Sequence, residues 1–184
     1  MNFTPFPKLT TERLSLRKIN KGDINEIYTL RSDENILKYI AQAKAKSIED
    51  AEKFITMINK GIEDNKWLFW GITLEESANI IGTICIWNID QKNFRAEIGY
   101  SMLNEFQGKG YMTEAIKKII DFSFSNLKLH SLEAHVHPNN LASIQVLKKN
   151  GFIKEAHLKD NIFFEGKFMD TSIYSLIDPN ARKS

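Results

Sequence analysis

Apolar residues recur along the chain with two spacings, and each change between them marks a change of secondary structure. An alternating pattern that starts at Leu14 predicts an edge strand. Helical spacing follows over residues 24–30, with Asp23 placed to cap that helix. A longer helical stripe over 51–62 comes just after Ser47-Ile48-Glu49-Asp50, which matches a capping box. We therefore expect two helices after the first strand.

The middle of the chain is rich in β-branched and aromatic residues and predicts three antiparallel strands. The expected strands are 67–73, 80–89 and 94–103, joined by the polar segments 75–79 and 90–93. The remaining elements are expected to be an amphipathic helix that runs to Asp121, a strand, a short helix stopped by Gly151 and a closing strand pair, at residues 111–121, 131–136, 140–150, 152–158 and 168–177.

Two segments fit no periodic pattern. Residues 32–46 have mixed polarity, so they are either the wall of a binding cleft or a plain connection. Residues 160–166 are expected to connect the closing strands. Without a repeat or a Pro/Gly-rich linker, the pattern predicts one mixed α/β domain over 1–184, with its core at 8–178.

Composition narrows the function classes. The 184 residues carry 25 Lys+Arg against 23 Asp+Glu, a net charge of +2 that is too small to argue for nucleic acid as a partner. The one cysteine, Cys85, lies in an apolar run and is expected to be a buried structural thiol rather than a nucleophile. With no leader pattern and no apolar run of membrane-spanning length, we expect a cytoplasmic protein without a membrane partner.

The loop Gln107-Gly108-Lys109-Gly110-Tyr111-Met112 is the most distinctive local feature. It lies between an apolar strand and an amphipathic helix, so unpaired backbone N–H groups at the helix start can face an anion. The glycines let a ligand approach the backbone closely. The loop matches neither the Walker pattern nor the three-glycine dinucleotide fingerprint.

This loop is followed by His137-Pro138-Asn139-Asn140-Leu141-Ala142-Ser143 and by Lys149-Asn150-Gly151-Phe152. In that order, the three motifs resemble the GNAT superfamily of acyl-CoA-dependent N-acetyltransferases, and most closely its RimJ/RimL branch of ribosomal-protein N-acetyltransferases. The resemblance extends from Thr11 to Ile177. It implies a mostly antiparallel twisted sheet of about seven strands flanked by about four helices.

The resemblance also implies acetyl-CoA as cosubstrate. Its pyrophosphate would lie on the amides of 108–113 and its pantetheine arm along 98–103. The implied coenzyme-binding residues are Ile98, Tyr100, Met102, Gln107, Gly108, Lys109, Gly110, Tyr111, Met112, Thr113, Asn140 and Ser143. Met112 departs from the family, which usually has Gly or Ala there, and Gln107 is expected to support the loop.

The departing thiolate needs an acid. Many family members supply a tyrosine at the position of Leu147, so here the resemblance points instead to Ser143, one turn earlier. Ser143 could also be an ordinary surface serine of its helix. Asn140 could cap that helix, hold the pantetheine arm, or do both.

Two residues are candidates for the base, Glu97 and His135. Glu97 could instead pair with Arg95 or Lys92, and His135 could be a half-buried structural side chain. An α-amine with a pKa of about 7.8 is about a quarter neutral near pH 7.4, whereas a lysine is almost fully charged. Weak evidence for a base therefore favours an N-terminal acceptor.

Other residues give weaker indications of a metal site, of the cavity wall or of a contact with the coenzyme. Glu133, His135 and His137 alternate along one strand, but they stand too nearly in a row for a closed metal shell, so no metal is expected. The three tryptophans, at 67, 70 and 87, are expected in the core or the cleft wall. Lys148 and Lys149 either meet the coenzyme's 3′-phosphate or form a solvated helix face.

The first prediction is an enzyme that moves acetyl from acetyl-CoA to a primary amine, foremost a protein N-terminal α-amine, by direct attack in a ternary complex. One alternative is a polyamine or aminoglycoside acceptor, which would need an acidic cleft near Asp33, Glu34 and Glu165. The other is a non-catalytic acyl-CoA-binding module, suggested by Leu147. Either a monomer or a homodimer is compatible with the sequence.

Overall fold

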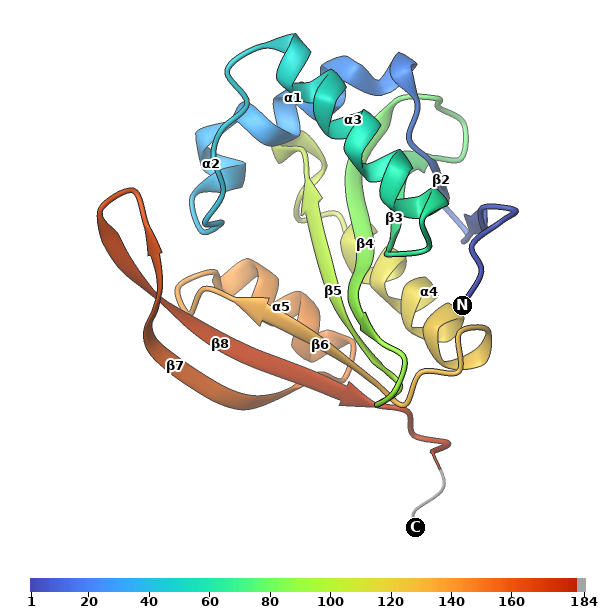
Figure 1. Cartoon of the computed structure of the whole chain (residues 1–184), viewed down its shortest axis with the longest axis vertical. Coiled ribbons are helices and arrows are strands. Elements are labelled where there is room, and N and C mark those ends of the chain that lie inside the picture. Colours follow the sequence, from blue (N-terminus) through green and yellow to red (C-terminus); the bar gives the residue numbers. More distant parts are fainter. Residues whose placement is uncertain (182–184) are drawn as a thin grey trace.

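The computed structural model describes residues 1–181, and these form one twisted eight-stranded sheet with helices on both faces (Figure 1). The strands are β1 Leu9–Thr10, β2 Leu14–Lys18, β3 Leu68–Leu74, β4 Ile80–Asp90, β5 Arg95–Met102, β6 Ser131–Val136, β7 Ile153–Phe164 and β8 Lys167–Ile177. The α-helices are α1 Ile24–Ser32, α2 Glu34–Leu37, α3 Ile48–Glu63, α4 Tyr111–Ser125 and α5 Leu141–Lys149.

The strand order is β1-β2-β3-β4-β5-β6-β8-β7, and every neighbouring pair is antiparallel except β5 with β6. The mixed, mostly antiparallel single domain predicted from the sequence is confirmed. The extra strand and helix beyond the expected counts are the two-residue β1 and the four-residue α2, both too short to leave a periodic pattern.

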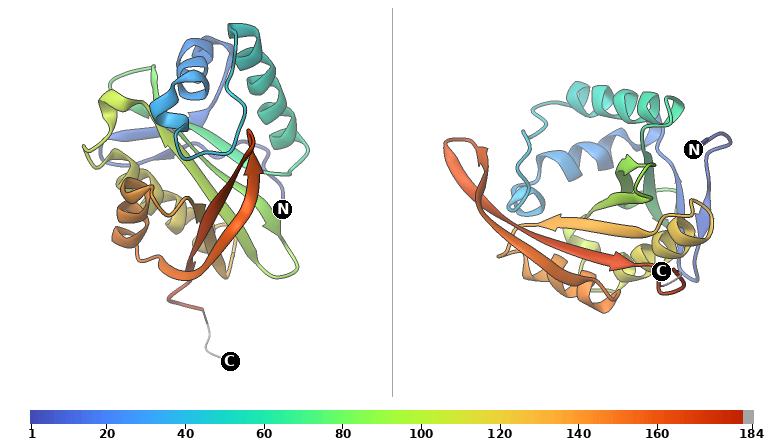
Figure 2. Two further views of the ribbon diagram at one scale, coloured as in Figure 1. Left: turned by 90° about the vertical axis from the view of Figure 1, so that its left-hand side faces the viewer. Right: turned by 60° about the horizontal axis from the view of Figure 1, so that its bottom comes forward.

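Two apolar clusters hold the helices to opposite faces of the sheet. Ile80 packs in the cluster with α1 and α3, whereas its neighbour Ile81 packs in the cluster with α4 and α5. This follows from the alternation of side chains along a strand. Figure 2 shows α3 and α1 on one side of the strands and α4 and α5 on the other.

Both predicted caps differ from the structure. The Asp23 carboxylate is buried and accepts hydrogen bonds from Arg17 and from the Asn20 N–H, so it bonds no N–H of α1. Ser47 precedes α3 and makes no side-chain cap hydrogen bond, and the Asp50 carboxylate accepts from the Lys46 N–H. The sequence placed both helix starts correctly but assigned the capping bonds wrongly.

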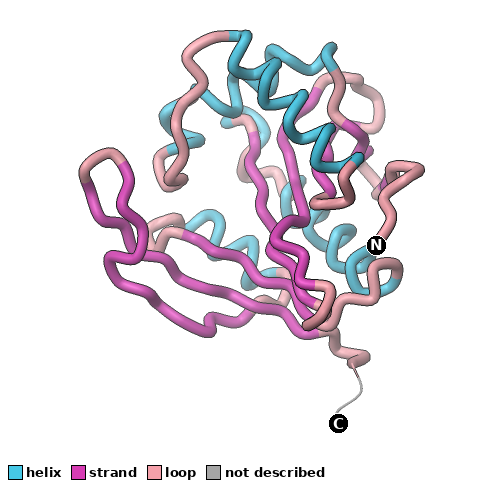
Figure 3. The backbone as a smooth tube through the Cα atoms, in the orientation of Figure 1, coloured by secondary structure: helices cyan, strands magenta, loops and turns pink. Residues whose placement is uncertain are grey.

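The closing hairpin also corrects a prediction. Residues 160–166 are not the connection, because β7 continues through them to Phe164 (Figure 3). A register shift between Leu158 and Ile162 absorbs the irregular residues, and only Glu165-Gly166 forms the turn. Both turn residues have positive φ, the geometry of two-residue hairpin loops.

Candidate active site

Strands β5 and β6 are paired only at their beginning. Arg95, Ala96 and Glu97 pair in parallel with 131–133, after which β5 follows β4 to Met102 and β6 follows β8 to Val136. Figure 1 shows the two groups of strands separating from this point. From Ile98 onward, the edge of β5 that faces β6 therefore has no strand partner, and its backbone groups are free to bind an extended ligand.

The glycine loop lies at the far end of this free edge. Gly108 and Gly110 have φ of +74° and +81°, and a Cβ added at Gly108 would meet nothing within 4 Å. Gly110 directly precedes the first turn of α4. The amide groups of the loop and the helix start are thus open, and they have the geometry of an anion site.

Hydrogen bonds from the side chains of Gln107 and Arg13 fix the loop. The Gln107 amide donates to the Met102 carbonyl at 2.9 Å, the loop-supporting geometry that the sequence predicts for this residue. Arg13 donates to the Lys109 carbonyl at 3.2 Å and is itself bound by Glu114. These contacts therefore fix the conformation of the loop.

The side chains of the other implied coenzyme residues fall into two groups. Ile98, Met102 and Met112 are at most 8% exposed and pack in the core, so they can offer a ligand only their backbone. Tyr111 is half-buried with the Arg13 guanidinium over its ring, and Lys109 is exposed. Lys148 and Lys149 are both exposed on α5, which is compatible with either role predicted for them.

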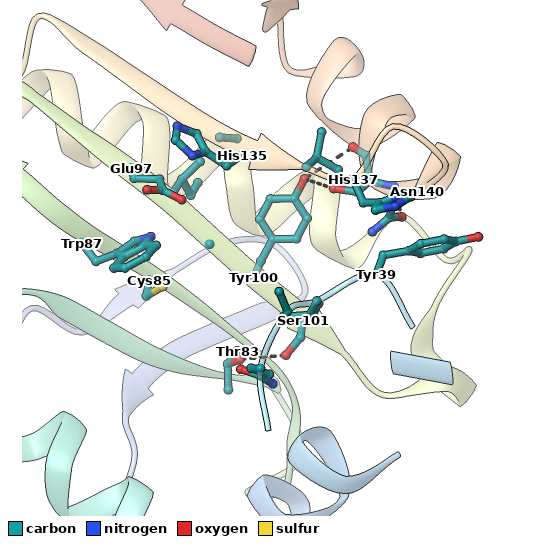
Figure 4. Close-up of a pocket in the computed structure, with 18 of the residues that line it drawn as sticks. Tyr39, Thr83, Cys85, Trp87, Glu97, Tyr100, Ser101, His135, His137 and Asn140 are labelled. Carbon is teal, nitrogen blue, oxygen red and sulfur yellow. Dashed lines mark hydrogen bonds between the residues drawn. The ribbon is translucent and has the colours of Figure 1, made fainter. Parts of the chain in front are cut away.

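Asn140 and Ser143 lie at the start of α5, opposite β5. The Asn140 side chain accepts a hydrogen bond from the Ser143 N–H at 3.1 Å, so it caps the helix. The Ser143 Oγ lies 2.8 Å from the hydroxyl of Tyr100 on β5 (Figure 4). Burial raises the pKa of Tyr100 to about 12, against the smaller opposing effect of the Ser143 hydrogen bond, so this hydroxyl keeps its proton at neutral pH.

A cavity of about 650 Å³ opens between the diverging strands. Its wall includes Glu97, Tyr100, His135, Asn140 and Ser143, so all the predicted catalytic residues face one space. Residues 39–42 also line it, so this part of segment 32–46 forms a wall of the cleft, whereas 34–37 form helix α2. A volume of this size suits a small molecule or the end of a peptide.

Glu97 is the acid of this cavity whose carboxyl pKa is raised. It is 7% exposed, and burial raises the pKa of its carboxyl above the ordinary value, while the nearby His135 and a 3.0 Å hydrogen bond from Asn88 oppose that shift. Arg95 does not pair with it, because Arg95 binds Glu133 instead. Glu97 thus has a carboxylate that is buried, aimed at the cavity and unpaired by Lys or Arg among residues 1–181.

His135 stands beside this carboxylate, with Nε2 3.6 Å from Glu133. Ligand atoms of Glu97, Glu133 and His135 lie within 4.8 Å of one another, so the trio differs from the one-strand set considered from the sequence. His137 is not part of it, since its ring stacks on Tyr39 and its Nδ1 accepts from the Asn139 N–H. Glu133 is already bound by Arg95 and Glu97 by Asn88, so the polar groups satisfy one another.

Cys85 and Trp87 form the wall opposite α5. Cys85 is half-buried at the cavity rather than deep in the core, which corrects the sequence-based placement. Burial raises the pKa of its thiol to about 12, so a thiolate is not available for attack. Trp70 is in the core and Trp87 is 41% exposed at the cavity, and both placements match the prediction for these tryptophans.

The family model described as "Acetyltransferase (GNAT) domain" matches residues 13–153. The chain belongs to the GNAT acetyltransferase family. This enzyme is therefore an acyltransferase of the GNAT type, an N-acetyltransferase that uses acetyl-CoA.

Among the described residues, no helix is both long and apolar enough to cross a bilayer.

The relatives of this GNAT enzyme differ in their acceptors. "Uncharacterized N-acetyltransferase YoaA" of Bacillus subtilis is 34% identical over 174 residues, which cover 95% of this chain and 98% of the relative. "[Ribosomal protein uS5]-alanine N-acetyltransferase" of Escherichia coli is 26% identical, covering 96% and 93%. The crystal structure of spermidine N-acetyltransferase from Vibrio cholerae in complex with CoA and spermine has a TM-score of 0.80 and 28% identity, covering 91% of this chain and 96% of that one.

The sequence analysis did not predict the part that several residues play in this cavity. The Tyr100 side chain was assigned only to the coenzyme strand, although its hydroxyl reaches Ser143 on α5. Asn88, Tyr39 and Arg31 carried no pattern that distinguishes them from surface residues. Their signal is purely spatial, since each lies in a different element of the GNAT fold and all three meet at the cavity.

Proposed function

We propose that this enzyme acetylates a primary amine by direct attack in a ternary complex, with a protein N-terminal α-amine as the foremost acceptor class. The observation that carries the proposal is the free edge of β5 between the open glycine loop and a cavity that holds both Glu97 and Ser143. When bound along that edge, acetyl-CoA supplies the acetyl group as a thioester.

Each end of the cavity has a defined task. The Glu97 carboxylate, with its raised pKa, accepts the proton that the attacking amine releases as the new N–C bond forms. The Ser143 hydroxyl donates a proton to the sulfur as the C–S bond breaks. Ser143 takes a proton in turn from the Tyr100 hydroxyl, its hydrogen-bond partner, and Tyr100 regains one from solvent. With the Cys85 thiol protonated, a covalent acetyl-cysteine route has no nucleophile.

The N-terminal acceptor is favoured by chemistry and by one relative. An α-amine has a pKa of about 7.8, so a single carboxylate suffices to remove its proton near neutral pH. The Escherichia coli relative is named for the alanine of ribosomal protein uS5. We extend this acceptor class, but not that substrate, to the present enzyme.

A polyamine is the second candidate because of the spermidine acetyltransferase relative from Vibrio cholerae. The hollow next to the cavity, where the acids near Glu34 and Glu165 were expected, does not carry the net negative charge that a polycation would need. Asp33 caps α2 through the N–H groups of Asn35 and Ile36. A neighbouring hollow of about 490 Å³, beside Glu34 and Glu165, is lined by three lysines and two glutamates, with Glu34 paired to Lys44.

Thermal unfolding with acetyl-CoA, with ATP as control, tests the coenzyme part of the proposal. A ligand at about a hundred times its Kd adds about 2.7 kcal/mol, which raises Tm by roughly 5–10 °C for this size of domain. Release of CoA is then measured with a peptide that starts with Ala or Ser, with spermidine and with an aminoglycoside. Binding of acetyl-CoA without turnover on any amine would contradict the enzyme proposal and favour a binding module.

A further inference from the structure

One cation in the cavity has no acidic partner. Arg31, near the end of α1, is half-buried and lines the cavity. It forms no ion pair with any carboxylate in the part of the chain that the structure describes. Its guanidinium lies over the Phe54 ring, 3.9 Å from the centroid, and its hydrogen bond to Gln42 is long, at 3.4 Å.

The other arginines of residues 1–181 are all paired. Each is bound to a carboxylate, in the pairs Arg13–Glu114, Arg17–Asp23 and Arg95–Glu133. A half-buried charge without a counter-ion is costly, and burial lowers the pKa of the Arg31 guanidinium with no carboxylate to oppose the shift. The guanidinium nonetheless stays charged at neutral pH, since an arginine is not deprotonated in proteins.

The acids of the same cavity are already engaged. Asp170 binds His157 at 2.7 Å and the Asp160 N–H at 2.9 Å, and Glu97 accepts from Asn88. Arg31 and Glu97 therefore present a positive and a negative group to one volume of about 650 Å³, which a single acceptor can fill. The planar, five-donor guanidinium suits a carboxylate or a phosphate.

We propose that Arg31 binds an anionic group of the acceptor, so that the preferred acceptor is a primary amine that also carries a carboxylate or a phosphate. The Glu97 end receives the amine, and the Arg31 end fixes the anion and thereby the orientation of the acceptor. The proposal deepens the function proposed above and depends on it.

Matched acceptors test the proposal. The pairs are an Ala-Asp against an Ala-Asn N-terminal peptide, alanine against alaninamide, and phosphoethanolamine against ethanolamine. The anion also raises the pKa of the neighbouring amine, so kcat/KM is compared per neutral amine within each pair. The three pairs distinguish a peptide side chain, a free carboxylate and a phosphate as the source of the anion. We expect kcat/KM to favour the anionic member of at least one pair by about tenfold or more, as a charge-assisted bond predicts.

Variants assign that preference to Arg31. Arg31→Gln should remove it mainly by raising KM for the anionic members, and Arg31→Lys should restore part of it. Lys53→Gln, which removes one charge from an exposed position of α3, is the control and should keep the preference. Equal rates within every pair in the wild type, or a preference that survives in Arg31→Gln, would overturn the proposal.

Two further outcomes are distinguishable. If Arg31→Gln does not fold, the proposal is tested by the preference of the wild type and by its reduction in the Arg31→Lys protein. If no amine is acetylated, the proposed function fails, and the anion site is tested by binding alone. The anionic members should then raise the Tm of the CoA complex in the wild type, less so in Arg31→Lys, and not in Arg31→Gln. Equal Tm with both members of each pair would then overturn the site as well.

Discussion

The two sides of the cavity are built from different parts of the backbone and from different kinds of interaction. On the coenzyme side, one continuous stretch from β5 through the glycine loop to α4 presents mainly main-chain groups. On the acceptor side, the wall comes from α1, segment 39–42 and the β7–β8 hairpin, and it presents side chains. A site made of main-chain groups can be predicted from local sequence motifs, whereas the proposed acceptor site is made of side chains that only the fold brings together.

The largest effect should come from the group shared by both sides, Glu97. Glu97→Gln should lower kcat by about a hundredfold or more, the usual contribution of a general base, and leave the affinity for acetyl-CoA unchanged. Because only the carboxylate accepts a proton, wild-type activity should rise with pH through the raised pKa of Glu97, and that limb should vanish in the variant. The pH profile of kcat/KM is the measurement.

His135→Ala serves as the matched control for Glu97→Gln, because its ring lies beside the same carboxylate. It should shift the acidic limb without removing it. Full activity in both variants would mean that solvent takes the proton, and the catalytic role of Glu97 would then be wrong.

A pair of glycines sharpens the comparison between the two sides. Gly110 on the coenzyme side and Gly166 in the β7–β8 turn have nearly equal φ, +81° and +80°. Alanine at either position costs about 1–2 kcal/mol of backbone strain. Both substitutions should lower Tm, but only Gly110→Ala should weaken acetyl-CoA binding, by roughly five- to thirtyfold. Calorimetric titration checks this, and equal loss of affinity in both variants would contradict a loop-specific site.

A smaller effect is expected where α5 meets β5. Tyr100→Phe removes the hydrogen bond to Ser143, worth about 1 kcal/mol, so kcat should fall about fivefold with little change in Kd for acetyl-CoA. In the Ser143→Ala background the same substitution should have almost no effect, since its partner is gone. Additive losses in the double variant would show that the two hydroxyls act independently.

The smallest effect concerns stability. Because the pKa of Glu97 is raised in the folded state, folding favours its protonated form, and this contribution to stability is lost as the pH rises through the folded pKa. Gln is neutral at every pH, so Glu97→Gln should gain stability relative to the wild type between about pH 5 and pH 8. Tm measured at both pH values checks the sign, and a relative loss at the higher pH would contradict it.

The same comparison explains how much of the molecule could be predicted. Strand β6, the start and end of α5 and the loop-supporting role of Gln107 follow from local signals such as alternation, a Gly stop and a motif. The β7–β8 turn was misplaced because Glu165-Gly166 is a weak turn signal beside the polar residues at 159–161. Arg31 and the Tyr100 hydroxyl could not be found, because their partners lie on other elements.

The most direct test of the central claim is hydrogen exchange of the protein with and without acetyl-CoA. The claim is that main-chain groups of β5 and of the glycine loop bind the coenzyme. Amides at 98–102 and 108–113 should therefore exchange more slowly in the complex, while those at 39–42 and in the β7–β8 turn should change little. Protection confined to the acceptor wall, or absent from both stretches, would contradict the claim and remove the basis for the coenzyme site.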